Sequence, residues 1–208
     1  MRQILLPTLA AATLAACGHL PVSTMWALRN FDAGNVEPAL LRAAIRIPDS
    51  LEPQPGGVKL EAGWWRDGRE DDKHTAKFVL QETTAPADVA PLAGERRPGT
   101  RLIVFRVNPA DIPKIHALQA EARAEKLKSP GKTQGTLGIG ADACRRGDLP
   151  DGPLLMTTFL RTDATRGYLT LLKDVDLRSA VTAEKSIDEL APTCEKFANR
   201  AETAKAGQ

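Results

Sequence analysis

The strongest structural signal in this 208-residue chain is the run Val58-Lys59-Leu60-Glu61-Ala62-Gly63-Trp64-Trp65, in which apolar and polar residues alternate. The same alternation returns after a polar connector, at Ala76, Phe78 and Leu80. Side chains of a β-strand point to opposite faces in turn, so a period of two indicates strands with one buried face. The connector contains the step Asp67-Gly68, which favours a turn. Residues 58–82 are therefore predicted to form an antiparallel hairpin.

Further strands are expected on both sides of this hairpin. Residues 101–107 are apolar on both faces, which is typical of a central strand. Three more β segments are predicted at 134–144, 154–161 and 167–173, and the last two are expected to pair as a second hairpin. Towards the N-terminus, residues 25–31 are expected to form a strand and residues 44–51 an extended segment.

Three helices are predicted. Residues 35–44 are expected to form a short helix, with Asn35 as its cap. A longer one is expected to begin at Asp111 as its cap and to end at Lys128, before Pro130-Gly131. The C-terminal helix, residues 186–201, begins with a capping box, Ser186 and Glu189, and Pro192 is expected to kink or split it. Residues 84–100 are expected to form a long exposed connection, because they are rich in Pro and Gly.

Strands joined by hairpins, with helices between them, are typical of an α+β domain. We expect a mostly antiparallel sheet with about two longer helices packed on one face. A β-sandwich with peripheral helices is the alternative. The length and the 42% apolar content suit one domain, assigned to residues 25–204.

The N-terminus has the features of an export signal. Arg2 is followed by an apolar stretch from Ile4 to Leu14, which is too short to cross a bilayer, and then by small residues. The sequence Leu14-Ala15-Ala16-Cys17 resembles the lipobox of bacterial lipoproteins. In that family the signal is cut before the cysteine, which receives diacylglycerol on its sulfur and an acyl chain on its new amine.

This resemblance implies a signal peptide at residues 1–16, a lipidated tether at residues 17–24 and a bilayer as partner through acylated Cys17. Gly18 stands where Asp marks inner-membrane retention in enteric bacteria, so the resemblance favours the outer membrane, with the domain facing the periplasm. The alternative is an ordinary cysteine near an ordinary cleavage site.

Two cysteines remain, Cys144 and Cys194. Exported proteins meet an oxidising compartment, in which an even number of cysteines usually pairs, so we expect a disulfide between them. Two buried free thiols are the alternative. The chain contains no Cys-x-x-Cys pair, the spacing used for redox catalysis and structural zinc sites.

Other sequence features exclude several functions. Aromatic residues make up 4% of the chain and its net charge is +2, which argues against a nucleic-acid-binding protein. The chain contains no Gly-x-Ser-x-Gly elbow and no dinucleotide-binding fingerprint. Glu70, Asp71, Asp72 and His74 form the densest group of metal-ligand types, but they lack cation-loop spacing and are expected to be a solvated hairpin tip. No cofactor or metal is predicted.

Trp64 and Trp65 are adjacent in a predicted strand, so one should fill the core while the other points outward. The outward ring is a candidate contact for a ligand, a partner or lipid headgroups, unless a loop or helix covers it. The leading functional hypothesis is a non-enzymatic envelope lipoprotein with a structural, accessory or partner-binding role, its partner another envelope protein. The alternative is a tethered periplasmic hydrolase or small-ligand-binding protein. A pocket holding His74 or His116 beside a carboxylate would favour the alternative.

Overall fold

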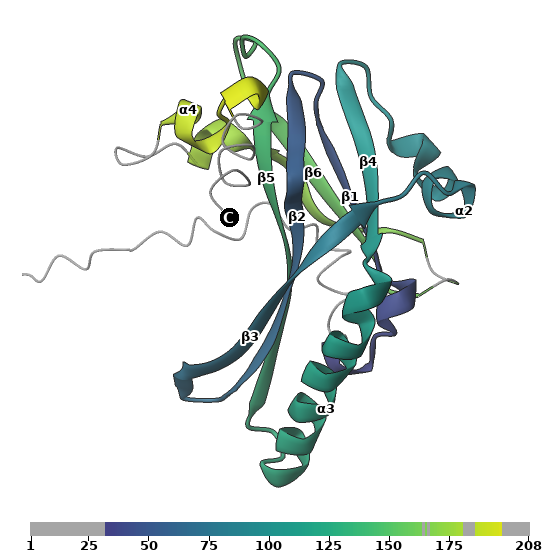
Figure 1. Cartoon of the computed structure of the whole chain (residues 1–208), viewed down its shortest axis with the longest axis vertical. Coiled ribbons are helices and arrows are strands. Elements are labelled where there is room, and N and C mark those ends of the chain that lie inside the picture. The colour runs from purple at the N-terminus through teal and green to yellow at the C-terminus, as the bar shows by residue number, and fades with distance from the viewer. Residues whose placement is uncertain (1–31, 164, 166, 181–185, 197–208) are drawn as a thin grey trace, which may run out of the picture.

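A computed structural model describes residues 32–163, 165, 167–180 and 186–196 (Figure 1). The expected signal peptide, the tether and the strand predicted at residues 25–31 lie outside the described residues. Seven strands are present: β1 (Arg42–Pro48), β2 (Leu51–Arg66), β3 (Arg69–Glu82), β4 (Thr100–Val107), β5 (Thr133–Arg145), β6 (Leu155–Arg161) and β7 (Leu169–Asp176).

All seven strands belong to one curled sheet in the order β5-β2-β3-β4-β1-β6-β7, and every neighbouring pair is antiparallel. The described chain is therefore an α+β fold with an antiparallel sheet, as predicted. The β-sandwich alternative is wrong, because a sandwich needs two sheets that face each other.

The predicted hairpin is β2 with β3, joined at Asp67-Gly68, where Gly68 has a φ of +72°. Leu60, Ala62 and Trp64 are buried, and the residues between them are more exposed, as the period of two requires. The outer part of this hairpin extends well beyond β4, because β4 pairs only with the last residues of β3, Leu80 to Glu82 (Figure 1).

The helix predicted at residues 35–44 is wrong. The chain makes two short 3-10 turns, η2 (Ala33–Asn35) and η3 (Pro38–Leu40), and then enters β1 at Arg42. Ala43, Ala44 and Ile45 are almost fully buried, because β1 lies between β4 and β6 and has other elements packed on both of its faces. A strand buried on both faces shows no alternation of apolar and polar residues. Its short apolar run therefore resembles a segment of a buried helix, which explains the wrong prediction.

The remaining predicted strands are confirmed. The strand expected at residues 101–107 is β4, which lies inside the sheet between β3 and β1. The strand expected at 134–144 is β5, at one edge of the sheet. The second hairpin is β6 with β7, which form the other end of the sheet.

The long helix α3 (Ile112–Lys128) is confirmed, although Asp111 at its N-cap position makes no capping hydrogen bond and binds Lys114 instead. At the C-terminal end, α4 (Ile187–Leu190) has the predicted capping box of Ser186 and Glu189. The helical conformation stops before Pro192 and resumes at residue 194, so this proline splits the predicted helix. The structure describes this second helical stretch only to residue 196.

The sheet has apolar packing on both faces. The larger core lies on the face that carries α3 and α4, since Ile115 and Ala191 pack there with Leu60 and Phe105. On the other face, α2 (Pro86–Val89) and the 3-10 segment η4 (Ala90–Glu95) cover a smaller cluster. The prediction that residues 84–100 form only an exposed connection is therefore wrong, because Leu92 is 1% exposed within that cluster.

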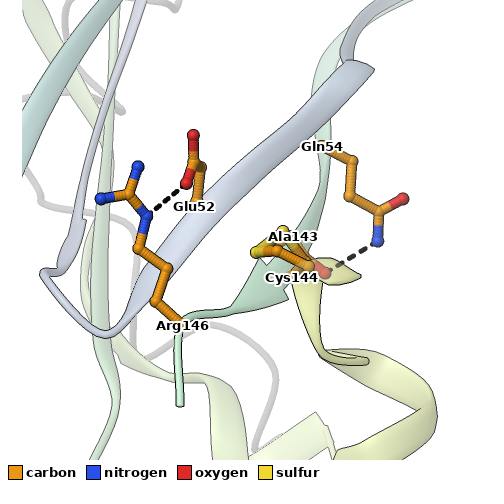
Figure 2. Close-up of a disulfide and its surroundings, with 6 residues drawn as sticks. Glu52, Gln54, Ala143, Cys144 and Arg146 are labelled. Atoms are coloured by element: carbon orange, nitrogen blue, oxygen red, sulfur yellow. Dashed lines mark hydrogen bonds and ion pairs between the residues drawn. A yellow bond between two sulfur atoms is a disulfide. The ribbon is translucent and has the colours of Figure 1, made fainter. Parts of the chain in front are cut away.

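The expected disulfide joins Cys144 at the end of β5 to Cys194, with a Cα–Cα distance of 4.9 Å (Figure 2). Beside it, the pairing of β2 with β5 shifts register between Pro53 and Val58. Gly57 lies in this bulge, where a Cβ atom would come within 2.7 Å of the Asp142 carbonyl oxygen, so only glycine fits without a backbone shift. The bridge, together with a hydrogen bond from the Arg145 backbone N–H to the Pro192 carbonyl, anchors the segment after α4 to the edge of the sheet.

Candidate functional site

A cleft of about 620 Å³ lies between α3 and the concave face of the sheet. Its floor comes from β2 and β5, with Leu60, Ala62 and Leu137 as apolar contributors. One wall is α3. The other is the segment that precedes β1, residues 32–41, which we call the N-terminal strap. Single residues of β6 and β7 complete the lining.

The cleft exists because α3 stands away from the sheet instead of packing closely on it. Only Ile115, Gln119 and Glu125 are buried among the 17 residues of this helix. Leu118 and Ala122 line the cleft and are only half-buried. Apolar surface left in contact with water costs about 25 cal/mol per Å², so the cleft walls gain free energy when an apolar body displaces that water.

A polar stripe on α3 holds the N-terminal strap. Lys126 Nζ lies 2.9 Å from Asp32 Oδ2, Arg123 Nη1 donates to the Gly34 carbonyl at 2.6 Å, and Gln119 Nε2 donates to the Val36 carbonyl at 2.7 Å. These helix residues recur every three or four positions, so they share one face of α3. The strap thus forms a second rim of the cleft, fixed mostly by exposed polar contacts.

Trp64 lies at the end of the cleft floor and is only 6% exposed. Its ring stacks on His74 with centroids 4.1 Å apart. The Trp64 Nε1 and Thr133 Oγ1 atoms are buried and have no hydrogen-bond partner among the residues that the structure describes. Gly135 pairs with Trp64 across the sheet, and a Cβ atom at Gly135 would meet nothing closer than 3.8 Å. The floor therefore combines open space beside Trp64 with two polar groups that lack partners.

Trp65 points to the other face of the sheet, as the strand alternation requires. It is half-buried, and the Lys73 ammonium lies 4.7 Å from its ring centre. Of the two predicted contact residues, Trp64 therefore lines the cleft and Trp65 does not.

The charged groups at the cleft are Asp32, Arg123 and Lys126. The hydrogen bond from Lys126 to Asp32 is the main reason that the pKa of Asp32 lies below its ordinary value. Nearby, Arg66 Nε and Glu125 Oε1 form an ion pair of 2.6 Å that ties the end of α3 to the end of β2, next to the β2–β3 turn. This contact ties one wall of the cleft, α3, to a strand that forms its floor.

Glu70, Asp71, Asp72 and His74 lie in the part of β3 that follows the β2–β3 turn. Within the described residues, no group of three or more His, Cys, Asp or Glu side chains is arranged to hold a metal ion. His74 Nε2 lies 3.8 Å from Asp72 Oδ1, and both side chains are 45% exposed. His116 Nε2 lies 3.6 Å from Glu37 Oε1 at a similarly exposed position. Neither histidine is among the residues that line the cleft.

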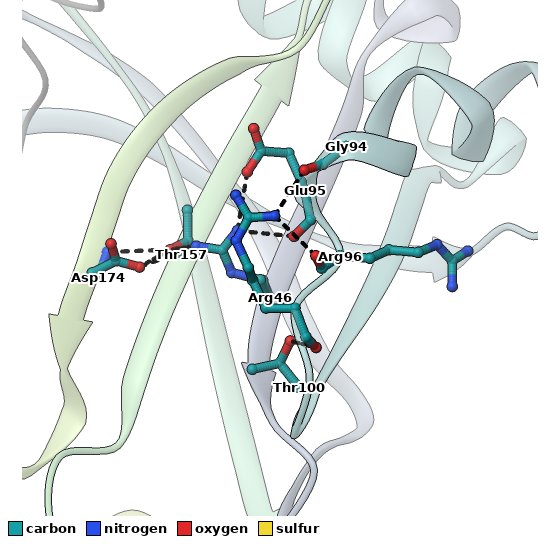
Figure 3. A network of polar contacts seen from close by, with 8 residues as sticks. Arg46, Gly94, Glu95, Arg96, Thr100, Thr157 and Asp174 are labelled. Atoms are coloured by element: carbon teal, nitrogen blue, oxygen red, sulfur yellow. Dashed lines mark hydrogen bonds and ion pairs between the residues drawn. The ribbon is translucent and has the colours of Figure 1, made fainter.

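Two polar clusters on the opposite face have structural roles. Arg46 binds the Glu95 side chain and backbone carbonyl, Thr157 Oγ1 and Asp174 Oδ1, so it fastens η4 and β7 to β1 (Figure 3). Asp88 of α2 pairs with both Arg42 and Arg161. Each charged side chain in these clusters has at least one oppositely charged partner, so the clusters hold α2, η4 and β7 against the sheet.

The sequence pattern did not reveal the cleft as a site. Its lining comes from six separate segments, and nothing in the linear pattern brings the strap to α3. One signal was present: His116, Gln119, Arg123 and Lys126 recur at helical spacing beside the apolar stripe of Ile115, Leu118 and Ala122. Such a polar stripe along the border of an apolar one indicates that the helix contacts more than a sheet.

Comparisons with known proteins place the chain in no family, because no protein-family model, curated protein or solved structure matches it. Among the described helices, none has both the length and the apolar character needed to span a bilayer. Functional inference therefore rests on the residues and their geometry.

Proposed function

We propose that the protein is a non-enzymatic bacterial envelope lipoprotein that is anchored by acylated Cys17 and binds a small, largely apolar ligand in the cleft under α3. The observation that carries the binding role is the cleft itself. Its volume of about 620 Å³ falls within the range of about 300–1,000 Å³ that is typical of small-molecule sites. Such sites combine apolar walls with polar groups that orient the ligand, and the lining of this cleft contains both.

The geometry favours binding over hydrolysis. A hydrolase site needs a nucleophile beside a base, usually a histidine that a carboxylate orients. Both described histidines have a carboxylate neighbour, but each pair lies at an exposed position outside the cleft lining. A ligand in the cleft would therefore meet hydrogen-bond donors and apolar carbons, with no described histidine among the residues that line the cleft.

Two glycines of β5 provide a matched test of the binding role. Gly135 lines the cleft, whereas Gly138 does not, and a Cβ atom at either position has no close contact. The substitution Gly135→Phe should fill the space beside Trp64 and weaken ligand binding at least about ten-fold, the effect of losing about 1.4 kcal/mol. Gly138→Phe should leave binding unchanged.

The measurement is the fluorescence increase of N-phenyl-1-naphthylamine, a neutral apolar dye. The dye is titrated into a protein that comprises residues 17–208 and carries Cys17→Ala. This protein has no attached acyl chain that could compete with the dye for the cleft. Circular dichroism of both variants checks that the sheet is intact. Equal dye affinity of the two phenylalanine variants would show that the dye does not enter the cleft, and the proposed role would fail.

The anchor is tested by Cys17→Ala. Each buried methylene contributes about 0.8 kcal/mol and two or more acyl chains hold a protein stably on a membrane, so loss of the modified sulfur should release the protein. We expect wild type, and the neighbouring control Gly18→Ala, in the membrane pellet and labelled by palmitate. Cys17→Ala should be unlabelled and soluble. Retention of Cys17→Ala in the pellet after a high-salt wash would contradict lipid anchoring.

A further inference from the structure

Resting on the proposed function, we propose that the ligand is an amphiphile with one acyl chain and an anionic headgroup. Its chain lies along the apolar floor of the cleft, its headgroup meets Arg123 at the rim, and it enters from the bilayer that holds the anchor. Three features of the cleft lead to this ligand class: its length, its charge and the position of its rim along the chain.

The length suits a single extended chain. The lining residues of α3 run from Ile115 to Lys126, which is about 16 Å of helix at about 1.5 Å per residue. Carbon–carbon bonds are about 1.5 Å long, so this length accommodates roughly a dozen atoms of an extended chain. Along it, Leu118 and Ala122 of α3 and Leu60 and Ala62 of β2 line the cleft. This apolar surface matches the hydrocarbon part of the ligand.

The rim carries one more cationic side chain than carboxylates. The cleft is lined by two cationic side chains and one carboxylate, and that carboxylate, Asp32, is paired with Lys126. Arg123 uses Nη1 to bind the Gly34 carbonyl, and within the described part of the chain it forms no ion pair. A guanidinium has five N–H donors in a planar fork, so Arg123 retains donors that match a carboxylate or phosphate. A cationic headgroup would be repelled at the same position.

The rim also lies close to the proposed anchor along the chain. Asp32 lines the cleft, and Cys17 precedes it by 15 positions. An extended chain advances at most about 3.6 Å per residue, which keeps the rim within roughly 55 Å of the acylated sulfur. A site tethered at this distance experiences a high effective concentration of membrane amphiphiles. The bilayer is therefore the source that the chain geometry favours.

The test uses the full lipoprotein in phosphatidylcholine vesicles with two photoreactive probes, a diazirine-bearing dodecanoate and the matching dodecanol. After illumination, mass spectrometry measures the labelling of peptides from β2, α3 and β5. We expect the dodecanoate probe to label these peptides. Arg123→Gln should lower that labelling about five- to ten-fold, because it removes one charged contact at a partly exposed rim. Arg123→Lys should restore part of the labelling, because it keeps the charge.

Arg97 is the matched control, because its Nη1 also donates to backbone carbonyls but it does not line the cleft. Arg97→Gln should label like wild type with both probes, and Arg123→Gln should keep its dodecanol labelling. Equal labelling by the two probes together with no effect of Arg123→Gln would overturn the anionic headgroup while leaving ligand binding intact. Absence of labelling in the cleft with either probe would overturn both this inference and the proposed function.

Discussion

Asp88→Ala is expected to lower the free energy of unfolding by about 3–5 kcal/mol, the usual cost of removing one partner from a buried ion pair. Asp88 is 5% exposed and pairs with Arg42 Nε at 2.9 Å and with Arg161. Its loss would leave two cations largely buried beneath α2 without their shared carboxylate. The measurement is urea unfolding followed by circular dichroism.

The pH dependence gives this prediction a second readout. Burial alone would raise the pKa of Asp88, but hydrogen bonds from Arg42 and Arg161 outweigh it and lower that pKa. A lowered pKa in the folded state means that the charged carboxylate contributes its stability above the unfolded pKa of about 3.9 and loses it as the pH falls through the folded pKa. The stability difference between wild type and Asp88→Asn should therefore be constant near pH 7 and narrow below about pH 4.

Asp142→Ala serves as the control, because Asp142 pairs with Lys59 at a largely exposed position. Exposed ion pairs contribute about 0–1 kcal/mol, so this variant should stay close to wild type. If Asp88→Ala were no less stable than Asp142→Ala, the buried cluster would not be holding α2 against the sheet.

The second large effect is expected from the disulfide. The double variant Cys144→Ser/Cys194→Ser should lose roughly 4 kcal/mol of unfolding free energy, because the bridge closes a loop with a sequence separation of 50. The loss arises mainly from the greater entropy of the unfolded chain. Urea unfolding measures it, and reduced wild type should match the double variant in midpoint.

The bridge also supports packing in the folded state. It anchors the segment that follows α4, and Ala191 in this segment is part of the larger core. On a non-reducing gel, Cys144→Ser should migrate more slowly than oxidised wild type, since the unfolded chain is no longer closed into a loop. Identical migration, or an unchanged urea midpoint for the double variant, would show that the two sulfurs are not joined in the protein as it is made.

The sequence alone was sufficient for the parts of the fold whose physics is local. The alternation from Val58 to Trp64 predicted β2 and its buried face, and the polar Asp67-Gly68 step predicted the turn. The helical period and its stop signals located α3 to within a residue of its observed bounds. The disulfide followed from the number of cysteines and the expected compartment.

The errors occurred where tertiary contacts decide the structure. Ala43 to Ile45 form a strand because β4 and β6 hydrogen-bond to both edges of β1, which a single-segment pattern does not reveal. Leu92 lies in a Pro- and Gly-rich segment whose composition predicts exposure, yet it is one of the buried residues of the smaller core. The cleft is the extreme case. Trp64 was recognised as one of an in-and-out pair, but the space beside it depends on how far α3 stands from β2 and β5.

The most direct test of the central claim is to identify what occupies the cleft in the protein taken from its own membrane. Wild type, Gly135→Phe and Gly138→Phe are purified from envelopes, and native mass spectrometry measures non-covalent adducts beyond the acylated chain. We expect one single-chain amphiphile on wild type and on Gly138→Phe, and none on Gly135→Phe. An identical adduct on all three proteins, or no adduct on any of them, would contradict ligand binding in the cleft beneath α3.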